Sequence, residues 1–154
     1  MRWLRTAWAV VACSAFLLSF SLPQASATMR ISDDVGGRIG AYVDQYSAVR
    51  NSGQRVVIDG VCLSACTLVL GIVPRERICV TNRANLGFHA AWMPGPEGRP
   101  IPSPAGTQAL WDMYPANVKR WLNSKGGLNA KMKFLRGREL MAMYPQCDRD
   151  AWVR

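Results

Sequence analysis

The stretch VVIDGVCLSACTLVLG, residues 56–71, decides the fold of this chain. Its first three residues, 56–58, form an apolar, β-branched run that is typical of a buried strand. Gly60 predicts a turn after that strand, and the apolar residues 65–70 predict a helix that is ended by the glycine following them. Ser64 therefore lies at an elbow between a strand and a helix.

A serine at such an elbow has two interpretations. The Ser64 hydroxyl can cap the first backbone N–H groups of the helix, or it can act as an exposed nucleophile beside the positive helix end. Capping is the commoner role. A nucleophilic serine needs a base, and His89, the single histidine of the chain, follows a second short strand at residues 77–80. Ser64 and His89 are therefore the candidate catalytic pair.

The N-terminal segment, residues 1–27, has the pattern of a secretory signal peptide. Two arginines precede an apolar run over residues 7–22, and the small residues ASA at 25–27 form a cleavage site. A transmembrane anchor and a lipoprotein signal at Cys13 are the alternatives, but serines interrupt the apolar run and few apolar residues precede the cysteine. We therefore expect an exported protein, periplasmic or secreted, whose single domain covers residues 28–154.

The charge of the chain restricts its partners. The 154 residues carry a net charge of +9, and removal of Arg2 and Arg5 with the signal peptide leaves about +7. The basic residues are dispersed, without the basic groove and interleaved aromatic residues of a nucleic-acid-binding module. We expect no nucleic-acid partner, and a weak, non-specific attraction to anionic envelope surfaces.

The cysteines provide a further constraint. The mature chain contains Cys62, Cys66, Cys79 and Cys147, and an even number in an exported protein predicts disulfides. Three pairings are open, and we favour one in which Cys62 or Cys66 bonds Cys79 and fixes the elbow to the next strand. A metal site is the alternative, but the chain has no second histidine or Cys-x2-Cys to complete a tetrahedral ligand set. We expect no metal and no other cofactor.

Strands and helices alternate in the first half of the mature chain. Residues 28–32 predict a short strand, and residues 38–50 predict a helix with one apolar face, before the strands at 56–58 and 77–80. This alternation predicts an α/β fold with right-handed crossovers and a parallel sheet. At the start of the first helix, Gly36-Gly37 either forms a simple entry turn or exposes backbone N–H groups to a ligand or an oxyanion.

The second half has a different composition. Residues 92–106 contain five prolines and predict a surface loop that could form a lid or a substrate edge. Apolar residues between 107 and 122 predict helical packing, with Pro115 restarting the helix. One more helix is expected over residues 132–143.

The order of these motifs resembles a known family. Gly36-Gly37, Gly60-x-x-x-Ser64 and Leu86-Gly87-Phe88-His89 are similar to the motifs of the Clp-type serine proteases, within the crotonase-like superfold and its branch of exported ClpP-like proteins. The intervals, 27 residues from Gly37 to Ser64 and 25 from Ser64 to His89, are close to those of that family. The resemblance implies a small, N-terminally minimal ClpP/crotonase-like fold of repeated ββα-type units with a mostly parallel sheet.

The resemblance also implies roles for individual residues. Ser64 would attack a carbonyl carbon, and His89 would accept the serine proton and later donate it to the leaving group. The backbone N–H groups of Gly37 and Ala65 would bind the oxyanion.

The family also has an acidic residue that orients the histidine. Glu139 lies 50 residues after His89 and matches the family spacing, whereas Asp150 is the alternate because its neighbouring residues match better. The assignment between the two stays open at this point.

The sequence therefore predicts a serine peptidase or hydrolase of the cell envelope that acts on a peptide or ester substrate. It would work alone and without ATP, because there is no ATP outside the cytoplasm. The alternative is a non-catalytic exported binding or structural protein that keeps the fold. The oligomeric state is open, and a homo-oligomer is one option.

Overall fold

The computed structural model describes residues 27–148. The predicted signal peptide lies outside the described residues except for Ala27, and Asp150 lies outside them as well. Among the described residues, no helix is both long enough and apolar enough to cross a membrane.

Strands and helices alternate over residues 28–80, as the sequence predicts. The strands are β1 (Thr28–Asp34), β2 (Arg55–Leu63), β3 (Ile78–Val80), β4 (Asn85–Phe88), β5 (Trp92–Pro94), β6 (Pro100–Pro102) and β7 (Lys133–Arg136). The helices are α1 (Ile39–Asn51), α2 (Val69–Ile72), α3 (Pro104–Met113), α4 (Ala116–Ser124) and α5 (Gly137–Met141). Three 3-10 helices cover Ser64–Leu68, Arg75–Arg77 and Pro96–Gly98.

The main sheet has five strands and is mostly parallel. Its order is β1-β2-β4-β7, and β3 also pairs with β2. Strands β1, β3 and β4 run parallel to β2, whereas β7 is antiparallel to β4. Because β1 occupies one edge of β2 along most of its length, β3 and β4 follow one another along the opposite edge. The predicted α/β class with a mostly parallel sheet is confirmed.

Strand β2 is the central element, and it is longer than the sequence predicts. The run at residues 56–58 is buried as expected, but the turn predicted at Gly60 is wrong, because the strand continues to Leu63. The pairing of β2 with β1 shifts register beside Gly60. A Cβ atom at Gly60 would lie 2.1 Å from the backbone oxygen of Ser32, so the glycine permits a close approach of the two strands. Ser64 follows directly at the end of β2.

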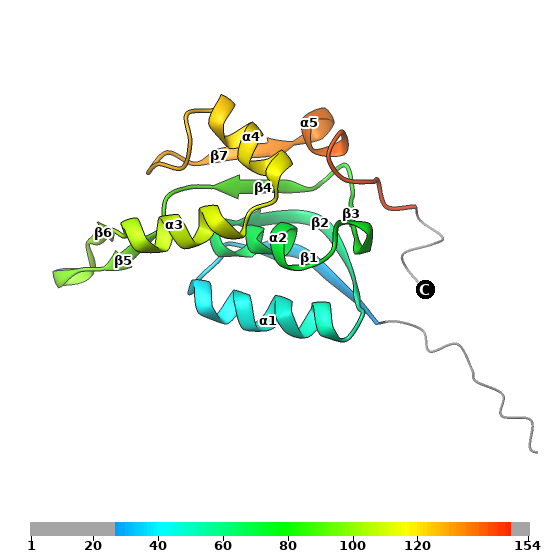
Figure 1. The fold of residues 1–154 in the computed structure, drawn as a ribbon, viewed down its shortest axis with the longest axis horizontal. Coiled ribbons are helices and arrows are strands. Elements are labelled where there is room, and N and C mark those ends of the chain that lie inside the picture. Colours follow the sequence, from blue (N-terminus) through cyan, green and yellow to red (C-terminus); the bar gives the residue numbers. More distant parts are fainter. Residues whose placement is uncertain (1–26, 149–154) are drawn as a thin grey trace, which may run out of the picture.

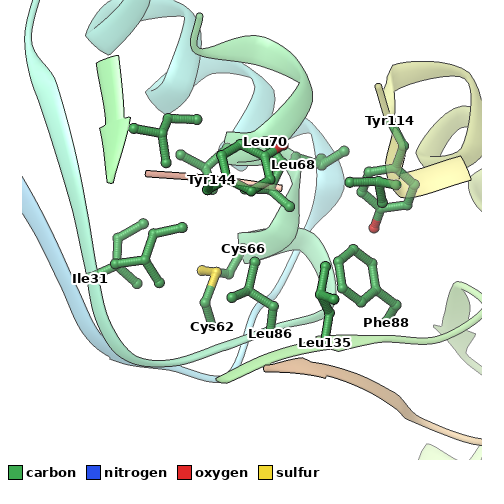
Figure 2. Packing of buried hydrophobic residues seen from close by; sticks show 14 of the residues in the cluster. Ile31, Cys62, Cys66, Leu68, Leu70, Leu86, Phe88, Tyr114, Leu135 and Tyr144 are labelled. Carbon is green, nitrogen blue, oxygen red and sulfur yellow. A yellow bond between two sulfur atoms is a disulfide. The ribbon is translucent and has the colours of Figure 1, made fainter. Parts of the chain in front are cut away.

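The core lies between the sheet and the helices. Figure 1 shows α1 running along one side of the sheet and the β5–β6 hairpin extending from one end of the molecule beside α3. Helix α1 buries Tyr46 and Val49, which belong to the apolar face that the sequence predicts. Figure 2 shows Cys62 and Cys66 inside this core beside Leu86. The strand-to-helix elbow is therefore built from core residues on both sides of Ser64.

The helix after the elbow is divided. Ser64–Leu68 forms a 3-10 helix, and α2 then runs through Gly71, the residue predicted to end the helix, to Ile72. A Cβ atom at Gly71 would lie 1.8 Å from the backbone oxygen of Met113, where α3 ends. The glycine therefore allows close helix packing at this point and does not end the helix.

Two predictions for the second half are corrected. The proline-rich segment is an antiparallel hairpin of β5 and β6 followed by α3, which begins at Pro104. The helix predicted over residues 132–143 is divided into β7 and the short helix α5. In β7 the exposed Phe134 alternates with the buried Leu135, which is the period of a strand paired on one face.

A buried carboxylate in the middle of β2 joins this strand to its neighbours. Asp59 is 6% exposed and forms ion pairs with Arg30 of β1 and Arg83 of the β3–β4 connection. The Thr81 hydroxyl also donates to its carboxylate, at 2.8 Å. Hydrogen bonding from Arg83, reinforced by Thr81 and Arg30, lowers the pKa of Asp59 to about 2 against the desolvation that burial causes.

Candidate active site

Ser64 occupies a strained elbow at the junction of β2 and the 3-10 helix. Its φ angle is +55°, in the left-handed region that residues with a side chain rarely adopt. The residue in the N-cap position is Leu63, and no side chain caps this helix. The Ser64 hydroxyl makes no hydrogen bond with any other residue between 27 and 148, so the capping interpretation is wrong. Backbone strain of this kind is concentrated at functional sites.

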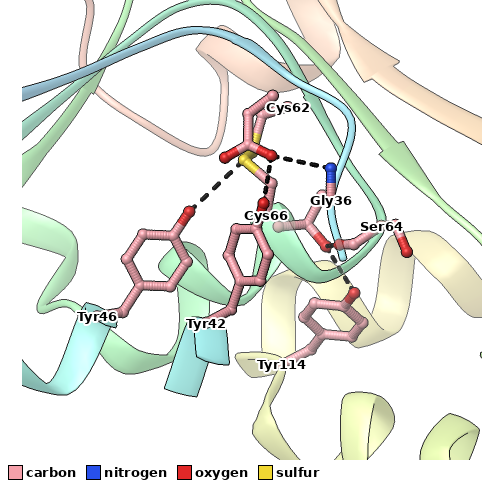
Figure 3. Close-up of a disulfide and its surroundings, with 9 residues drawn as sticks. Gly36, Tyr42, Tyr46, Cys62, Ser64, Cys66 and Tyr114 are labelled. Atoms are coloured by element: carbon pink, nitrogen blue, oxygen red, sulfur yellow. Dashed lines mark hydrogen bonds between the residues drawn. A yellow bond between two sulfur atoms is a disulfide. The ribbon is translucent and has the colours of Figure 1, made fainter. Parts of the chain in front are cut away.

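The elbow is fixed by bonds on both sides of Ser64. A disulfide joins Cys62 to Cys66 and closes a loop of the residues between them. The Thr67 hydroxyl donates to the backbone oxygen of Ser64 at 2.6 Å, and the buried Tyr114 hydroxyl lies 2.6 Å from the same Thr67 oxygen (Figure 3). The conformation of Ser64 is therefore held independently of its own side chain.

The disulfides differ from the favoured pairing. Cys62 bonds Cys66, and Cys79 bonds Cys147, so the prediction that the elbow is bonded to Cys79 is wrong. Cys79 pairs in register with Val57, which lies five residues before Cys62 on β2. That interval corresponds to about 16 Å along a strand, far beyond the Cα separation of roughly 7 Å that a disulfide can span. The prediction of up to two disulfides among the four cysteines is confirmed.

His89 follows β4, the strand that pairs with the end of β2. Its Nδ1 atom lies 2.7 Å from the backbone oxygen of Ala90. A carbonyl oxygen can only accept a hydrogen bond, so Nδ1 must carry the proton in this contact. In the neutral imidazole the Nε2 atom is then the acceptor, which is the atom a general base uses.

Ser64 and His89 line the same cavity, which has a volume of about 670 Å³. Gly36 and Gly37, at the turn before α1, line it too. No hydrogen bond joins the Ser64 hydroxyl to the His89 ring within the described part of the chain. In unliganded enzymes such bonds are often long and form only when substrate is bound. The structure therefore brings three of the predicted elements together around one cavity: nucleophile, base and glycine turn.

Part of the cavity lining is apolar and exposed. Trp92 and Met93 of β5 are 55% and 49% exposed, and Val35, beside the glycine turn, is 71% exposed. Arg38 is the one arginine or lysine in the lining, as judged from residues 27–148. Large apolar side chains that remain exposed beside a cavity are typical of a surface that binds a ligand.

The predicted acidic residue is not placed in this cavity. Glu139 lies on α5, where Lys125 Nζ donates to its Oε1 atom at 3.0 Å. Hydrogen bonding from Lys125 lowers the pKa of Glu139. The residues that line the cavity do not include Glu139, and Asp150 lies outside the described residues. In this structure the Nδ1 partner of His89 is a backbone oxygen.

The comparisons with known proteins leave the family unassigned. No family model matches the chain, and no curated protein matches its sequence. The described residues contain no group of three or more His, Cys, Asp or Glu side chains that could hold a metal ion. The site is therefore interpreted from its own geometry.

Several residues of the site were not identified from the sequence. They are Asp34 and Tyr42 beside the glycine turn, Thr67 and Tyr114 behind the elbow, and the Ala90 carbonyl at His89. Asp34 had a usable signal, because Asp two residues before Gly commonly forms a local turn with the backbone. The contact between Thr67 and Tyr114 spans 47 residues and has no local sequence signal.

Proposed function

We propose that this protein is a serine hydrolase of the cell envelope that acts on peptide or ester bonds without ATP. The observation that carries the proposal is the convergence of Ser64, His89 and the Gly36-Gly37 turn on one cavity. The left-handed backbone of Ser64 supports it, because the hydroxyl has no role as a helix cap. The two disulfides fit an oxidising compartment and so support export.

The chemistry is acyl transfer. The Ser64 Oγ atom attacks the substrate carbonyl carbon while its proton passes to Nε2 of His89, and the imidazolium then protonates the leaving group. A water molecule attacks the resulting ester, gives its proton to the same nitrogen, and releases the acid and the free serine. The Nδ1 hydrogen bond to Ala90 holds the ring in the tautomer that this sequence of steps requires.

The negative charge that develops on the substrate oxygen needs donors near Ser64. The N–H of Ala65 is at the start of the 3-10 helix, where the first N–H groups have no partner within the helix. The Gly37 N–H has no hydrogen-bond partner among the described residues and belongs to the turn that lines the cavity. These two groups are the proposed oxyanion hole, in agreement with the resemblance to the Clp-type proteases.

The apolar wall suggests which substrates enter. Trp92 and Met93 present exposed apolar surface in the cavity that the proposed nucleophile also lines, and such surface favours an apolar acyl group or side chain next to the scissile bond. The family assignment, with its ClpP/crotonase-like fold, is part of the same proposal. It rests on the motif spacing and on the mostly parallel sheet.

A non-catalytic binding protein is the second candidate. Two observations favour it: the exposed apolar wall suits ligand binding, and no acidic side chain among residues 27–148 contacts His89. Hydrolysis measurements separate the two candidates.

The test is hydrolysis of p-nitrophenyl esters and fluorogenic peptides by the oxidised mature protein. Ser64→Ala and His89→Ala should each lower kcat by at least about a thousandfold, and the double variant should be little worse, because such groups act as a unit. Ser52→Ala is the control: its hydroxyl donates to the Val49 backbone oxygen at the end of α1, and hydrolysis should be unchanged. Absence of hydrolysis by the wild-type protein, together with binding of apolar ligands, would favour the binding protein.

A further inference from the structure

The turn between β1 and α1 is held by a side chain that the catalytic proposal does not use. Asp34 ends β1, and its Oδ1 atom accepts two hydrogen bonds. One comes from the backbone N–H of Gly36 at 2.8 Å, and the other comes from the hydroxyl of Tyr42, on α1, at 2.5 Å (Figure 3). The carboxylate therefore joins the glycine turn to the first helix.

Gly36 is packed directly against the elbow. Its φ angle is +83°, and a Cβ atom there would lie 2.5 Å from the backbone oxygen of Leu63 and 2.7 Å from the Cβ of Ser64. The same hypothetical atom would lie 3.1 Å from the backbone nitrogen of Ala65. A rotation of the Gly36 backbone would therefore change the surface beside the nucleophile and beside one proposed oxyanion donor.

The backbone N–H groups of Gly36 and Gly37 differ in their hydrogen bonding. The Gly36 N–H is engaged by Asp34, whereas the Gly37 N–H has no partner among residues 27–148. The peptide unit between the two glycines carries that free N–H, and the backbone angles of Gly36 set its direction. Consecutive glycines have little conformational preference of their own, so an external contact must define these angles.

We propose that Asp34 is a positioning residue for the Ser64 site: its carboxylate, with Tyr42, fixes Gly36 so that the Gly37 N–H faces the substrate oxyanion. This inference rests on the proposed hydrolase function. Asp34 does not touch the substrate and acts only through the backbone of the turn.

Asp34 could act through its negative charge or through its ability to accept hydrogen bonds, and these two roles can be distinguished. A carboxylate near the oxyanion would oppose the developing negative charge, so the useful property of Asp34 is its ability to accept two hydrogen bonds. The oxygen of an asparagine side chain can accept the same two bonds without the charge. Burial, followed by the hydrogen bond to Asp34, raises the pKa of Tyr42 to about 12, so its hydroxyl remains a donor over the working pH range.

The experiment compares ester hydrolysis by the oxidised wild-type protein with that of four variants. Asp34→Ala should lower kcat by roughly 30-fold to 100-fold with KM changed less than about twofold, since the lost interaction is made in the transition state. Asp34→Asn should stay within about threefold of wild type, and Tyr42→Phe, which keeps the Gly36 bond, should fall between them. The matched control is Asp44→Ala, which removes an exposed carboxylate of α1 and should leave kcat unchanged.

A second measurement does not depend on activity. Amide hydrogen exchange should show a protected Gly36 N–H in the wild type and in Asp34→Asn, with the protection lost in Asp34→Ala. If Asp34→Ala does not fold, the intermediate kcat of Tyr42→Phe and the near-normal kcat of Asp34→Asn decide the question.

The outcomes distinguish the two proposals. A wild-type protein without hydrolytic activity contradicts the hydrolase proposal and this one with it. An active wild type with unimpaired kcat in Asp34→Ala contradicts the positioning role alone. A lower melting temperature in Asp34→Ala with unchanged kcat also contradicts it, because the contact would then serve only stability. An Asp34→Asn variant as impaired as Asp34→Ala would show that the charge, and not the acceptor, is needed.

Discussion

Two parts of the Ser64 cavity lining, the elbow around the nucleophile and the β5–β6 hairpin, are built in different ways. On the nucleophile side, the elbow is enclosed by a disulfide, by the contact with Gly36 and by the Thr67–Tyr114 pair, and Cys62 and Cys66 are fully buried. The two strands of the β5–β6 hairpin, in contrast, pair with each other in a separate two-stranded sheet and leave Trp92 and Met93 about half exposed.

This difference matches two requirements of an acyl-transfer site. The reacting groups must be held in a fixed geometry, because small displacements reduce the rate strongly. The surface that receives the substrate must stay accessible until substrate covers it. We therefore expect changes on the nucleophile side to affect stability and kcat, and changes on the hairpin to affect KM with little effect on stability.

The largest expected effect on stability comes from the disulfides. Replacing Cys79 and Cys147 by alanine opens a loop with a separation of 68 residues, and loop entropy predicts a loss of about 4 kcal/mol. Replacing Cys62 and Cys66 opens a loop with a separation of 4 residues, for which about 2 kcal/mol is predicted.

The effect of the two disulfides on activity should have the reverse order. The Cys62/Cys66 double variant should lose most of its hydrolytic activity, because that disulfide encloses Ser64, whereas the Cys79/Cys147 variant should keep it while folded. Urea unfolding and ester hydrolysis on the same samples measure both properties. A fully active Cys62/Cys66 variant would show that the elbow keeps its conformation without the disulfide.

The next effect is at the glycine turn. Gly36→Ala places a Cβ atom against the backbone of Leu63 at a positive φ angle, and we expect it to lower the free energy of unfolding by about 3 kcal/mol and to abolish hydrolysis. Gly40→Ala is the matched control on the same segment, because a Cβ atom there would meet no atom of another part of the chain within 4 Å. Because Gly40 lies in helix α1, replacing it by alanine should raise the free energy of unfolding by about 0.5 kcal/mol. Equal stability of the two variants would contradict the tight contact at the elbow.

Acid should weaken the framework through Asp59. Its pKa is about 2 in the folded protein and near 3.8 ordinarily, so the unfolded chain binds the proton more readily than the folded one. The carboxylate therefore contributes about 2 kcal/mol of stability above pH 4, and this contribution is lost as the pH falls toward 2. Urea unfolding between pH 6 and pH 2 measures how steeply the free energy of unfolding changes with pH. Asp59→Asn should remove the contribution of Asp59 to this pH dependence. An unchanged pH dependence in the variant would show that other carboxylates cause it.

The smallest effect on stability is expected at the hairpin. Trp92→Ala should change the free energy of unfolding by less than about 0.5 kcal/mol, because the side chain is 55% exposed. It should raise KM for esters with apolar acyl groups by about tenfold through the contact area that is lost. Ile101→Ala is the control: Ile101 is 42% exposed on β6, opposite Met93, but does not line the cavity. Equal KM values for the two variants would show that Trp92 of the hairpin does not contact the substrate.

The sequence predicted the elements that depend on local patterns. The apolar run of β2, the amphipathic face of α1 and the elbow at Ser64 all rest on periodicity within a few residues, and the structure has them. The sequence predicts a turn at Gly60 in place of the observed register shift, because the shift depends on the approach of Ser32, on a strand that is distant in sequence. The division of residues 132–143 into β7 and α5 was missed because pairing with β4, and not local preference, decides it.

In the candidate site, too, the features set by local sequence were predicted and those set by distant contacts were not. Ser64, His89 and the glycine turn were identified from motif order, and the structure places them around one cavity. The disulfide pairing was wrong because it depends on the register of β3 against β2, which the sequence does not specify. Glu139 was chosen by spacing alone, and the structure pairs it with Lys125, while a backbone oxygen contacts His89.

The most direct test of the catalytic proposal is labelling of the oxidised mature protein with a fluorophosphonate probe, followed by mass mapping of the adduct. We expect one adduct, on the peptide that contains Ser64, and its loss in Ser64→Ala and His89→Ala. Ser103 is an internal comparison, because it lines the same cavity but its hydroxyl accepts the Gly106 N–H as the cap of α3. A wild-type protein that remains unlabelled, or is labelled at Ser103 in place of Ser64, would contradict the assignment of Ser64 as an activated nucleophile.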